Sequence, residues 1–484
     1  MNTFYITTPI FYPTGVPHIG TAYNVFIADT LARYYRQKLG RDNVFFLTGT
    51  DEHGGNIAKK AAEEGKSPQE YVDGYAEIFQ NIWKNLNISN DYFVRTTNPE
   101  HERFAQELIQ KSYDNGDIYE GEYEGWYCES CEAYYAESDL IDGKCPNHPT
   151  KSPVFTKEKN YYFKLSKYQD WLLEYYEQNP EFIRPVKWAS YVKGMVSQGL
   201  QDIPVTRANV KWGVKVPFDP EQTIYVWYDA LPNYLSTLHF SEFEEKGYYD
   251  KFWKSAHHLV GKDIIKFHAI LWPAMLKSAN LTLPKSVLVH GFFTVNGQKI
   301  GKSNNNAIDP VELSQKYTID AVRYTLLSEF QVGNDGDFSF ERLEAKYNGE
   351  LANNFGNLVN RVIHLSNKKE VEINNFDKVE NDFKSKVDEW HSNFENNIES
   401  FLIFEAIQLI SELCSFGNKY IDDNKPWLEA DRSKVELTLN NLSYLLSKVI
   451  DAYSSIIPDA SLKAREALEK RESVILFPKL EEGK

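Results

Sequence analysis

A histidine and a glycine near the N-terminus stand where a strand is expected to give way to a helix. They belong to Pro17-His18-Ile19-Gly20-Thr21, between an apolar segment and a run with helical spacing of apolar residues. A helix N-terminus offers unpaired N–H groups and positive potential, which favour phosphate. His18 can donate to phosphate oxygens there, and Gly20 lets a nucleotide approach the backbone closely. For so short a motif, the alternative is an ordinary loop histidine beside a helix-start glycine.

Two lysines three residues apart form a second candidate. They lie in Lys299-Ile300-Gly301-Lys302-Ser303, on a polar loop that follows the apolar run SVLVHGFF. Two cationic side chains on such a loop can clamp a polyphosphate and stabilise a negatively charged leaving group. The alternative is a solvated, charged turn.

Four potential metal ligands cluster in Cys128-x₂-Cys131-x₁₃-Cys145-x₂-His148. Two ligand pairs with this spacing can close a tetrahedral Zn²⁺ site, and four protein ligands leave no open position, so the predicted zinc is structural. The alternative is a set of thiols without metal. The remaining cysteine, Cys414, lies in an apolar helical stretch and is expected in the core.

Together with the stretches around them, these motifs resemble one enzyme family. PHIGT and KIGKS are similar to HIGH and KMSKS, the signature motifs of class I aminoacyl-tRNA synthetases. Longer stretches resemble methionyl-tRNA synthetase of the single-zinc-knuckle type, in that family's order and over nearly the whole chain. They are TTPIFYPTGVPHIG, FFLTGTDEHG, the cysteines after GWYC, YVWYDALPNY, LVGKDIIKFHAILWPAML and VHGFFTVNGQKIGKS.

The resemblance implies ATP-dependent attachment of L-methionine to methionine tRNA through a methionyl-adenylate, with release of pyrophosphate and AMP. Mg²⁺ would accompany ATP, and positioning with charge neutralisation would supply the catalysis without a protein nucleophile. The implied catalytic residues are His18, Lys299 and Lys302. The implied ATP-binding residues are His18, Gly20, Thr21, Asp263, Lys299 and Lys302.

The family's methionine pocket also corresponds to positions in this sequence. Asp51 would accept from the substrate ammonium, aromatic rings would pack against the polarizable thioether, and Tyr12 and His268 would offer polar atoms near the sulfur. Trp227 and Trp272 are equally compatible with core packing, or with both roles. The full set is Ile10, Tyr12, Asp51, Trp227, Ala230, Tyr234, Ile264, His268 and Trp272.

Two positions depart from the family's motifs. Thr21 replaces the second histidine of HIGH, and Ile300-Gly301 replaces the Met-Ser of KMSKS. Threonine keeps a hydroxyl donor but is shorter and uncharged, so stabilisation of the pentacoordinate phosphate should weaken by ~1–3 kcal/mol if nothing compensates. These changes leave a second interpretation open, a weakly active or non-catalytic tRNA-binding relative.

The sequence predicts that the elements carrying these residues form a parallel α/β unit. Apolar runs predict strands at 4–11 and 43–47, and helical spacing predicts helices at 21–39 and up to Gly65. Such repeats place active loops at the carboxyl ends of a parallel sheet. The pattern is expected to return at 223–227, 259–276 and 286–293, with a helix near 320–330.

The predicted fold class is α/β, a Rossmann-like parallel-sheet catalytic domain with a zinc-containing insertion, followed by an α-helical anticodon-binding domain. Near residue 116 the regular βα alternation gives way to Tyr, Trp, Pro and Gly, and from about 347 the chain reads as amphipathic helices. The expected segments are 1–116 (catalytic domain, first half), 117–222 (connective insertion), 223–291 (second half), 292–346 (KMSKS-type loop and stem-contact region) and 347–484 (helical domain).

Composition excludes several broad classes. The 484 residues are 42% hydrophobic and 25% charged, which rules out wholesale disorder and collagen-like repeats. No apolar run approaches the ~18–20 residues of a membrane-spanning helix, so a cytoplasmic protein without a membrane partner is expected. The net charge of −16 argues against non-specific binding to polyanions, although a local basic groove can sit on an acidic body.

By the resemblance, the acceptor end of methionine tRNA receives the methionyl group and the C-terminal helices bind its CAU anticodon. Acidic residues outnumber basic ones in 351–484, so recognition should rest on a local surface and on aromatic stacking with unpaired bases. Trp427 matches the family's stacking tryptophan, and a buried helix-end tryptophan is the alternative. Asn357 and Arg361 match too loosely to transfer a role. A monomer is expected, because the sequence ends without the dimer-forming domain of some family members.

Two other functions fit parts of the pattern. A class I synthetase for another amino acid, such as cysteine, would use zinc in its substrate pocket, whereas a fully coordinated Cys₃His site has no position for substrate. A zinc-scaffold interaction protein would lose its main activity when the metal is removed. Methionine-dependent exchange of pyrophosphate into ATP separates the enzyme from the scaffold and from a non-catalytic relative.

Overall fold

The computed structural model describes residues 2–128, 133–135, 137–146, 149–295, 297–300 and 306–480, without the side chains of 123, 124, 133, 134, 158 and 299. The chain forms two compact units, each assembled from separate stretches of sequence. Unit 1 spans Met1–Val16, Asp42–Lys84 and Asn90–Val289, and unit 2 spans Pro17–Arg41, Asn85–Ser89 and His290–Lys484.

Unit 1 is built on a six-stranded sheet in the order β3-β2-β1-β12-β13-β7. The pairs β3–β2, β2–β1, β1–β12 and β13–β7 are parallel. The inner strands begin with buried apolar runs, FYI in β1 and VFFL in β2, as expected for parallel strands that are covered on both faces. The strands are β1 (Phe4–Phe11), β2 (Val44–Thr50), β3 (Tyr92–Arg95), β7 (Ile183–Arg184), β12 (Ala256–Gly261) and β13 (Ser286–His290).

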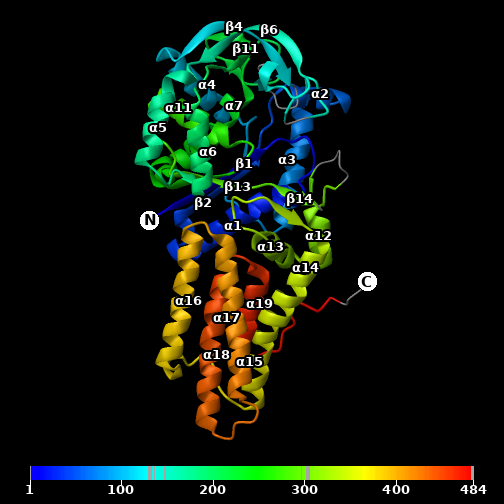
Figure 1. Ribbon diagram of the computed structural model, residues 1–484, viewed down its shortest axis with the longest axis vertical. Coiled ribbons are helices and arrows are strands. Elements are labelled where there is room, and N and C mark those ends of the chain that lie inside the picture. The colour runs from blue at the N-terminus through cyan, green and yellow to red at the C-terminus, as the bar shows by residue number, and fades with distance from the viewer. Residues whose placement is uncertain are drawn as a thin grey trace. The chain divides into compact units, whose positions relative to one another are not determined.

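Helices connect these strands along the chain in unit 1, and several of them are labelled in Figure 1. The helix that matters most for the site, α4, begins at Pro99 directly after Asn98, whose side chain accepts a hydrogen bond from the Glu100 N–H. The helices are α2 (Gly55–Glu63), α3 (Pro68–Asn85), α4 (Pro99–Asp114), α5 (Gln169–Gln178), α6 (Val186–Ser197), α7 (Val226–Ala230), α8 (Asn233–Ser236), α9 (Ser241–Glu244), α10 (Tyr248–Phe252), the π-helical segment Phe267–Leu271 and α11 (Trp272–Ser278).

The insertion in unit 1 is antiparallel. Its sheet has the order β5-β4-β6-β8, formed by β5 (Ala133–Tyr135), β4 (Ile118–Cys128), β6 (Val154–Phe163) and β8 (Ile203–Pro204). The long pair β4–β6 runs in register from Ile118 opposite Phe163 to Tyr127 opposite Val154, and both strands are labelled in Figure 1. A second small sheet joins β10 (Lys215–Val216), β11 (Asp219–Ile224) and β9 (Thr206–Arg207).

The expectation of an α/β-type strand at 223–227 is wrong. Thr223 and Ile224 pair antiparallel with Arg207 and Thr206 in the small sheet, and α7 begins at Val226. A short apolar run fits a buried strand and the first turn of a buried helix equally well, so its periodicity could not separate the two.

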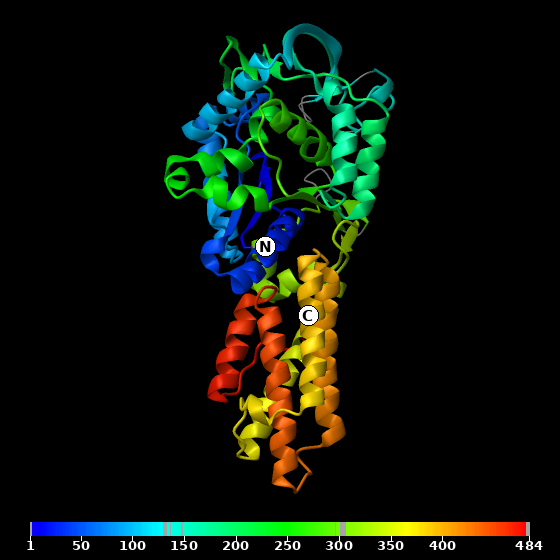
Figure 2. The ribbon, with the colours of Figure 1, turned by 90° about the vertical axis from the view of Figure 1, so that its left-hand side faces the viewer.

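Unit 2 contains α1 and the C-terminal helices, together with a small sheet in the order β15-β14-β16. Its long helices α16, α17 and α18 run side by side, in yellow to red in Figure 2. The elements are α1 (Ile19–Leu39), β14 (Phe293–Val295), β15 (Gln298–Lys299), α12 (Pro310–Tyr317), α13 (Ile319–Ser328), β16 (Gly336–Phe338), α14 (Phe340–Lys346), the π-helical segment Tyr347–Gly356, α15 (Asn357–Lys368), α16 (Asn381–Glu399), α17 (Ile403–Asn424), α18 (Arg432–Tyr453) and α19 (Pro458–Lys470).

A buried ion pair fixes α1 inside unit 2. The guanidinium of Arg323 in α13 lies 2.7 Å from the Asp29 carboxylate of α1 and donates to the Ile456 carbonyl at 2.9 Å, ahead of α19. Burial opposes ionisation of Asp29, but the charges of Arg323 and Arg33 lower the pKa of its carboxyl. Because α1 begins at the PHIGT turn, this pair also fixes the direction of that turn.

Several other predicted elements agree with the structure. The strand expected at 4–11 is β1, the helix expected at 21–39 is α1, and the chain is helical from α14 onward. Cys414 is fully buried in α17, as expected for a core residue. Among the described residues, no helix is long and apolar enough to cross a membrane.

Candidate active site

The residues predicted to bind methionine gather in unit 1 at the carboxyl ends of its strands. Ile10 lies opposite Gly49 where β1 and β2 pair, and Tyr12 directly follows β1. Asp51 directly follows β2, and its N–H donates to the Phe11 carbonyl at 3.0 Å. Parallel strands end at one edge of the sheet, so the parallel register brings these three residues together.

Further members of the predicted pocket come from α7 and from the helical segments after β12. The indole of Trp227 in α7 stacks on Phe267, with ring centroids 3.8 Å apart and an interplanar angle of 7°. It also meets the His268 ring edge-on at 6.2 Å. Trp227 is partly exposed, so its ring remains available to a ligand.

A hydrogen-bond chain links His268 to Tyr234. His268 Nδ1 lies 3.1 Å from the Ile264 carbonyl, which can only accept, so Nδ1 carries the proton. Burial lowers the pKa of His268 to about 4, so the ring is neutral and Nε2 accepts from the Tyr234 hydroxyl at 2.7 Å. Burial and the charge of Asp51 raise the pKa of Tyr234, and this electrostatic influence links Asp51 to the same cluster.

Trp272 and Ala230 are more deeply buried than Trp227. Trp272 is fully buried, and its indole N–H donates to His258 Nε2 at 3.3 Å. The His258 ring in turn stacks on Tyr234 with centroids 4.2 Å apart. In this structure Trp272 is therefore a core residue, whereas Trp227 is partly exposed.

Asp263 lies in the turn after β12, in the same unit. Its side chain is exposed. An exposed carboxylate beyond the carboxyl end of a parallel strand can accept hydrogen bonds from ribose hydroxyls.

The PHIGT turn opens α1 in unit 2. His18 is the N-cap residue, and its Nδ1 accepts from the Gly20 N–H at 3.1 Å, while the His18 N–H donates to Thr21 Oγ1 at 3.5 Å. Burial lowers the pKa of His18, and the neutral ring that accepts at Nδ1 carries its proton at Nε2. Nε2–H and the Thr21 O–H are thus donors that the cap does not use.

The lysine loop approaches that turn within unit 2. Ile300 Cδ1 lies 3.5 Å from the position that a Cβ on Gly20 would occupy, and the Ile19 N–H donates to the Ile308 carbonyl at 3.0 Å. Lys299 belongs to β15 and its backbone pairs with Thr294 of β14. The side chain of Lys299 and the whole of Lys302 lie outside the described residues. Of the residues in the two signature motifs that the structure describes, Gly20 and Ile300 therefore lie against one another.

Two of the four predicted zinc ligands are described. Cys128 ends β4 and Cys145 lies in the following turn region, and both are buried. Cys145 is the one buried side chain among residues 137–146, where the others are exposed or partly exposed. Cys131 and His148 lie outside the described residues, and the described part of the chain contains no group of three possible metal ligands.

The predicted anticodon residue lies in unit 2, in the turn after α17. Trp427 is 38% exposed, so it is not the buried helix-end tryptophan of the alternative interpretation. Arg361 of α15 donates to the Asn418 side chain at 3.2 Å and pairs with Asp422, both on α17. Asn357 donates to the same Asn418 side chain at 3.3 Å, so both residues have structural contacts between α15 and α17.

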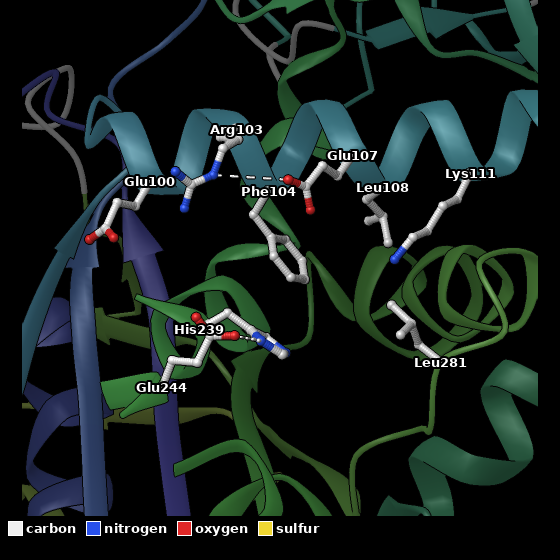
Figure 3. Close-up of a pocket in the computed structure, with 9 residues that line it drawn as sticks. All are labelled: Glu100, Arg103, Phe104, Glu107, Leu108, Lys111, His239, Glu244 and Leu281. Atoms are coloured by element: carbon white, nitrogen blue, oxygen red, sulfur yellow. Dashed lines mark ion pairs between the residues drawn. The ribbon is translucent and has the colours of Figure 1, made fainter. Parts of the chain in front are cut away.

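A cavity of about 380 Å³ lies elsewhere in unit 1, against α4 (Figure 3). Phe104 of α4 and His239 face one another with centroids 5.3 Å apart, and His239 lies 3.9 Å from Glu244. None of the predicted site residues lines this cavity. Its lining is Glu100, Arg103, Phe104, Glu107, Leu108, Lys111, His239, Glu244 and Leu281.

The sequence did not single out several residues that contact members of the predicted pocket. Phe267 stacks on Trp227, and His53 binds Asp229, which lies between the predicted pocket residues Trp227 and Ala230 on α7. The TDEHGG stretch drew attention to Asp51 but carried no signal that His53 pairs with a residue far away in sequence. An ion pair between distant positions leaves no local pattern.

Comparisons with known proteins show which chains this one is similar to. A family model described as "tRNA synthetases class I (M)" matches residues 4–152 and 148–363. The methionine–tRNA ligase of Caldanaerobacter subterraneus subsp. tengcongensis is 42% identical over 491 residues, covering 100% of this chain and 76% of that protein. The ligase of Thermotoga maritima is 43% identical over 473 residues, covering 95% and 74%.

Solved structures are similar over the same length. Methionyl-tRNA synthetase of Mycobacterium tuberculosis in complex with methionyl-adenylate superimposes with a TM-score of 0.91 at 33% identity, covering 99% of this chain and 100% of that chain. The free form of the Mycobacterium tuberculosis enzyme gives a TM-score of 0.85 at 30% identity, covering 100% and 99%.

Proposed function

Since the chain belongs to the methionyl-tRNA synthetases, we propose that its predicted site residues activate methionine in the roles set out below. The reaction is ATP-dependent attachment of L-methionine to methionine tRNA through a methionyl-adenylate. The observation that carries the residue assignment is the meeting of the two signature motifs, where Ile300 lies 3.5 Å from the Cβ position of Gly20.

In this proposal the triphosphate is bound at the N-terminus of α1. Gly20 leaves the backbone open, His18 donates from Nε2–H, and Thr21 donates from its hydroxyl, since neither donor is used by the helix cap. Lys299 and Lys302 would neutralise charge on the pyrophosphate leaving group. Mg²⁺ would enter with ATP, and the Asp263 carboxylate would accept from the ribose.

Methionine would bind in the pocket of unit 1. Asp51 would accept hydrogen bonds from the ammonium group, with Ile10 and Tyr12 beside it on the neighbouring strand end. Trp227 would contact the thioether, while Tyr234, Ile264 and His268 form the wall and Ala230 and Trp272 support it. The neutral His268 and the Tyr234 hydroxyl make this wall polar but uncharged.

The activation step is an in-line displacement. A carboxylate oxygen of methionine forms a bond to the α-phosphorus of ATP, the bond from that phosphorus to the bridging oxygen breaks, and pyrophosphate leaves with the electron pair. Positioning and charge neutralisation lower the barrier. The 2′-hydroxyl of the terminal adenosine of tRNA then attacks the activated carbonyl, and AMP leaves.

Zinc is proposed as a structural metal held by Cys128, Cys131, Cys145 and His148. Burial of Cys145 within an otherwise exposed stretch supports this, since one small thiol cannot order such a loop by packing. When bound, the metal would cross-link the segment 128–148 within the insertion. It would take no part in the displacement.

The remaining proposals concern tRNA binding, the roles of the segments, the cellular compartment and the oligomeric state. The helical segment 347–484 is proposed as the anticodon-binding domain, with Trp427 stacking on a base of CAU, and the segments 1–116, 117–222, 223–291 and 292–346 keep their predicted roles. The enzyme is proposed to act in the cytoplasm, where its tRNA is used. A monomeric state stays a prediction, which light scattering of the purified chain checks.

Methionine-dependent exchange of labelled pyrophosphate into ATP tests the function. The purified chain should catalyse exchange with L-methionine and not with L-cysteine. Lys302→Ala should lower kcat of exchange about 100-fold and leave the KM for methionine within about twofold, because the lysine acts on charge that develops in the transition state. Absence of exchange with intact tRNA binding would favour the non-catalytic relative instead.

A further inference from the structure

A buried carboxylate between two imidazoles lies beside the predicted methionine pocket. Asp229 is 1% exposed, and its two oxygens lie 2.7 Å from His53 Nδ1 and 3.1 Å from His101 Nε2. A carboxylate can only accept, so both of these nitrogens carry protons. His101 continues to Ser236 Oγ at 2.8 Å, and His53 Nε2 lies 3.5 Å from Glu102.

The cluster joins the two elements that carry the pocket. His53 lies two residues after Asp51, and Asp229 lies on α7 between Trp227 and Ala230. The backbone carbonyl of His53 also accepts from the Tyr12 hydroxyl at 3.1 Å. One residue therefore contacts α7 through its side chain and the end of β1 through its backbone.

The residue between Asp51 and His53 is anchored as well. Glu52 is fully buried and accepts from Arg95 at 2.7 and 2.9 Å and from the Thr50 hydroxyl at 2.6 Å. Asp51 is thus followed by two residues that are bound in different directions, Glu52 to the end of β3 and His53 to α7. A carboxylate on a loop held in this way has little freedom to move.

The charges in the cluster are those of an ion pair. Burial opposes ionisation of both groups, but the Asp229 charge raises the pKa of His53 to about 10, and the two imidazoles lower the pKa of Asp229 to about 2. A buried ion pair is a poor source of stability compared with apolar packing, and its best-attested use is to fix one geometry. This points to positioning as the role of the pair.

We propose that His53 is a positioning residue that fixes the distance between the Asp51 loop and α7 through Asp229, and thereby sets the affinity of the pocket for methionine. The inference rests on the proposed methionine pocket. His101 supports the second oxygen of Asp229 from the buried face of α4, and the adjoining face of that helix lines the cavity in Figure 3.

Steady-state pyrophosphate exchange with His53 variants tests the inference. His53→Ala removes the donor, whereas His53→Asn keeps an amide donor near the position of Nδ1. We expect His53→Ala to raise the KM for methionine about 20-fold and His53→Asn about threefold, with kcat and the KM for ATP within about twofold of the parent enzyme. Partial rescue by asparagine is the signature of the hydrogen bond to Asp229.

The matched control is His239→Asn. His239 also faces a carboxylate in unit 1 but lies in the α4 cavity, away from the pocket. We expect no change in the KM for methionine in this variant. Melting temperatures of all variants show whether they fold. If His53→Ala does not fold, the KM for methionine of His53→Asn decides whether the inference holds.

Three results would overturn the inference. They are an unchanged KM for methionine in His53→Ala, an equal rise in the KM values for methionine and ATP, and loss of kcat alone in His53→Asn. Asp51→Asn separates this failure from failure of the pocket itself. If Asp51→Asn raises the KM for methionine and His53→Ala does not, the pocket stands and the positioning role is wrong; if neither does, the pocket assignment fails as well.

Discussion

At the residue scale, His18 uses one ring nitrogen to hold its own turn. Nδ1 accepts from the Gly20 N–H and closes the cap of α1, which leaves Nε2–H as the donor that can meet a phosphate. Thr21 completes the same cap from its hydroxyl oxygen. The threonine that replaces the family's histidine is therefore part of the turn geometry.

Gly20→Ala should lower the rate of adenylate formation. An added Cβ would lie 3.1 and 3.2 Å from the His18 ring, so the imidazole must shift and its bond to the Gly20 N–H must lengthen. We expect kcat of pyrophosphate exchange to fall about tenfold with little change in the KM for methionine, because a misplaced donor weakens positioning of the phosphate.

Gly74→Ala is the control for this substitution. Gly74 lies inside α3 and its Cβ would meet nothing within 4 Å, so this variant should keep its activity and gain roughly 0.5–1 kcal/mol of stability. Equal kcat in the Gly20→Ala variant and the parent enzyme would mean that the His18 ring has no role in the rate.

The His53–Asp229 pair should make stability depend on alkaline pH. The folded pKa of His53 is about 10 against about 6.5 when unfolded, so its contribution is complete below pH 6.5 and is lost as the pH rises toward 10. The free energy of unfolding of the parent enzyme relative to His53→Asn should therefore fall by an amount on the order of 3 kcal/mol over that range. Urea titrations of both proteins at several pH values measure it, and a constant difference would show that His53 is not charged.

At the element scale, the turn after α17 presents Trp427 to solvent. α17 ends at Asn424, the left-handed backbone of its cap residue Lys425 (φ 43°) stops the helix, and Pro426 follows. The tryptophan is thus held on a short turn between two long helices rather than inside the bundle. A rigid, exposed ring of this kind suits stacking on an unpaired base.

Trp427→Ala should impair charging of tRNA and spare activation of methionine. Loss of one stacked base costs ~1–3 kcal/mol, so kcat/KM for tRNA should fall roughly tenfold to 100-fold while pyrophosphate exchange is unchanged. Leu428→Ala is the neighbouring control, since Leu428 is 72% exposed but has no ring to stack. Loss of both tRNA charging and pyrophosphate exchange in Trp427→Ala would show that the residue has a structural role instead.

The elements that the sequence predicted well are those with a continuous local pattern. β1 and α1 are bounded by proline, glycine and a cap, and their apolar spacing extends over many residues. Pairings between distant segments have no such pattern: Tyr5 lies opposite Ala256, and His53 binds Asp229. The π-helical segment that carries Phe267 and His268 departs from the regular helical period, so the spacing of apolar residues could not predict it.

At the scale of the whole molecule, the acidic balance of the chain constrains how it meets tRNA. With a net charge of −16, long-range attraction to the whole chain is a poor source of affinity, so we expect the proposed interface to depend on local contacts, for which Trp427 is the candidate. The candidate site shows the same difference between local patterns and distant pairings. Residue types and motif order predicted which residues belong to it, whereas only the folded structure shows their hydrogen-bond partners.

Zinc removal should loosen the insertion before it affects activation. The purified chain should contain one zinc per molecule by elemental analysis, and Cys145→Ser should lower that content. Chelation should increase protease cleavage near 128–148 and reduce tRNA charging, while methionine-dependent exchange falls only as the protein unfolds. If the zinc-free chain were cleaved by protease no faster than the zinc-bound chain, the proposed structural role of zinc would be wrong.

Neither unit is a continuous length of chain, since the backbone passes between them at 16/17, 41/42, 84/85, 89/90 and 289/290. On the ribosome, β1 emerges well ahead of β12, which is synthesised some 250 residues later, so one edge of β1 stays unpaired until then. A single cut in the gene consequently cannot yield the unit with the six-stranded sheet and the unit with the C-terminal helices as separate products. Any attempt to express one of them alone has to splice its distant pieces together with new linkers.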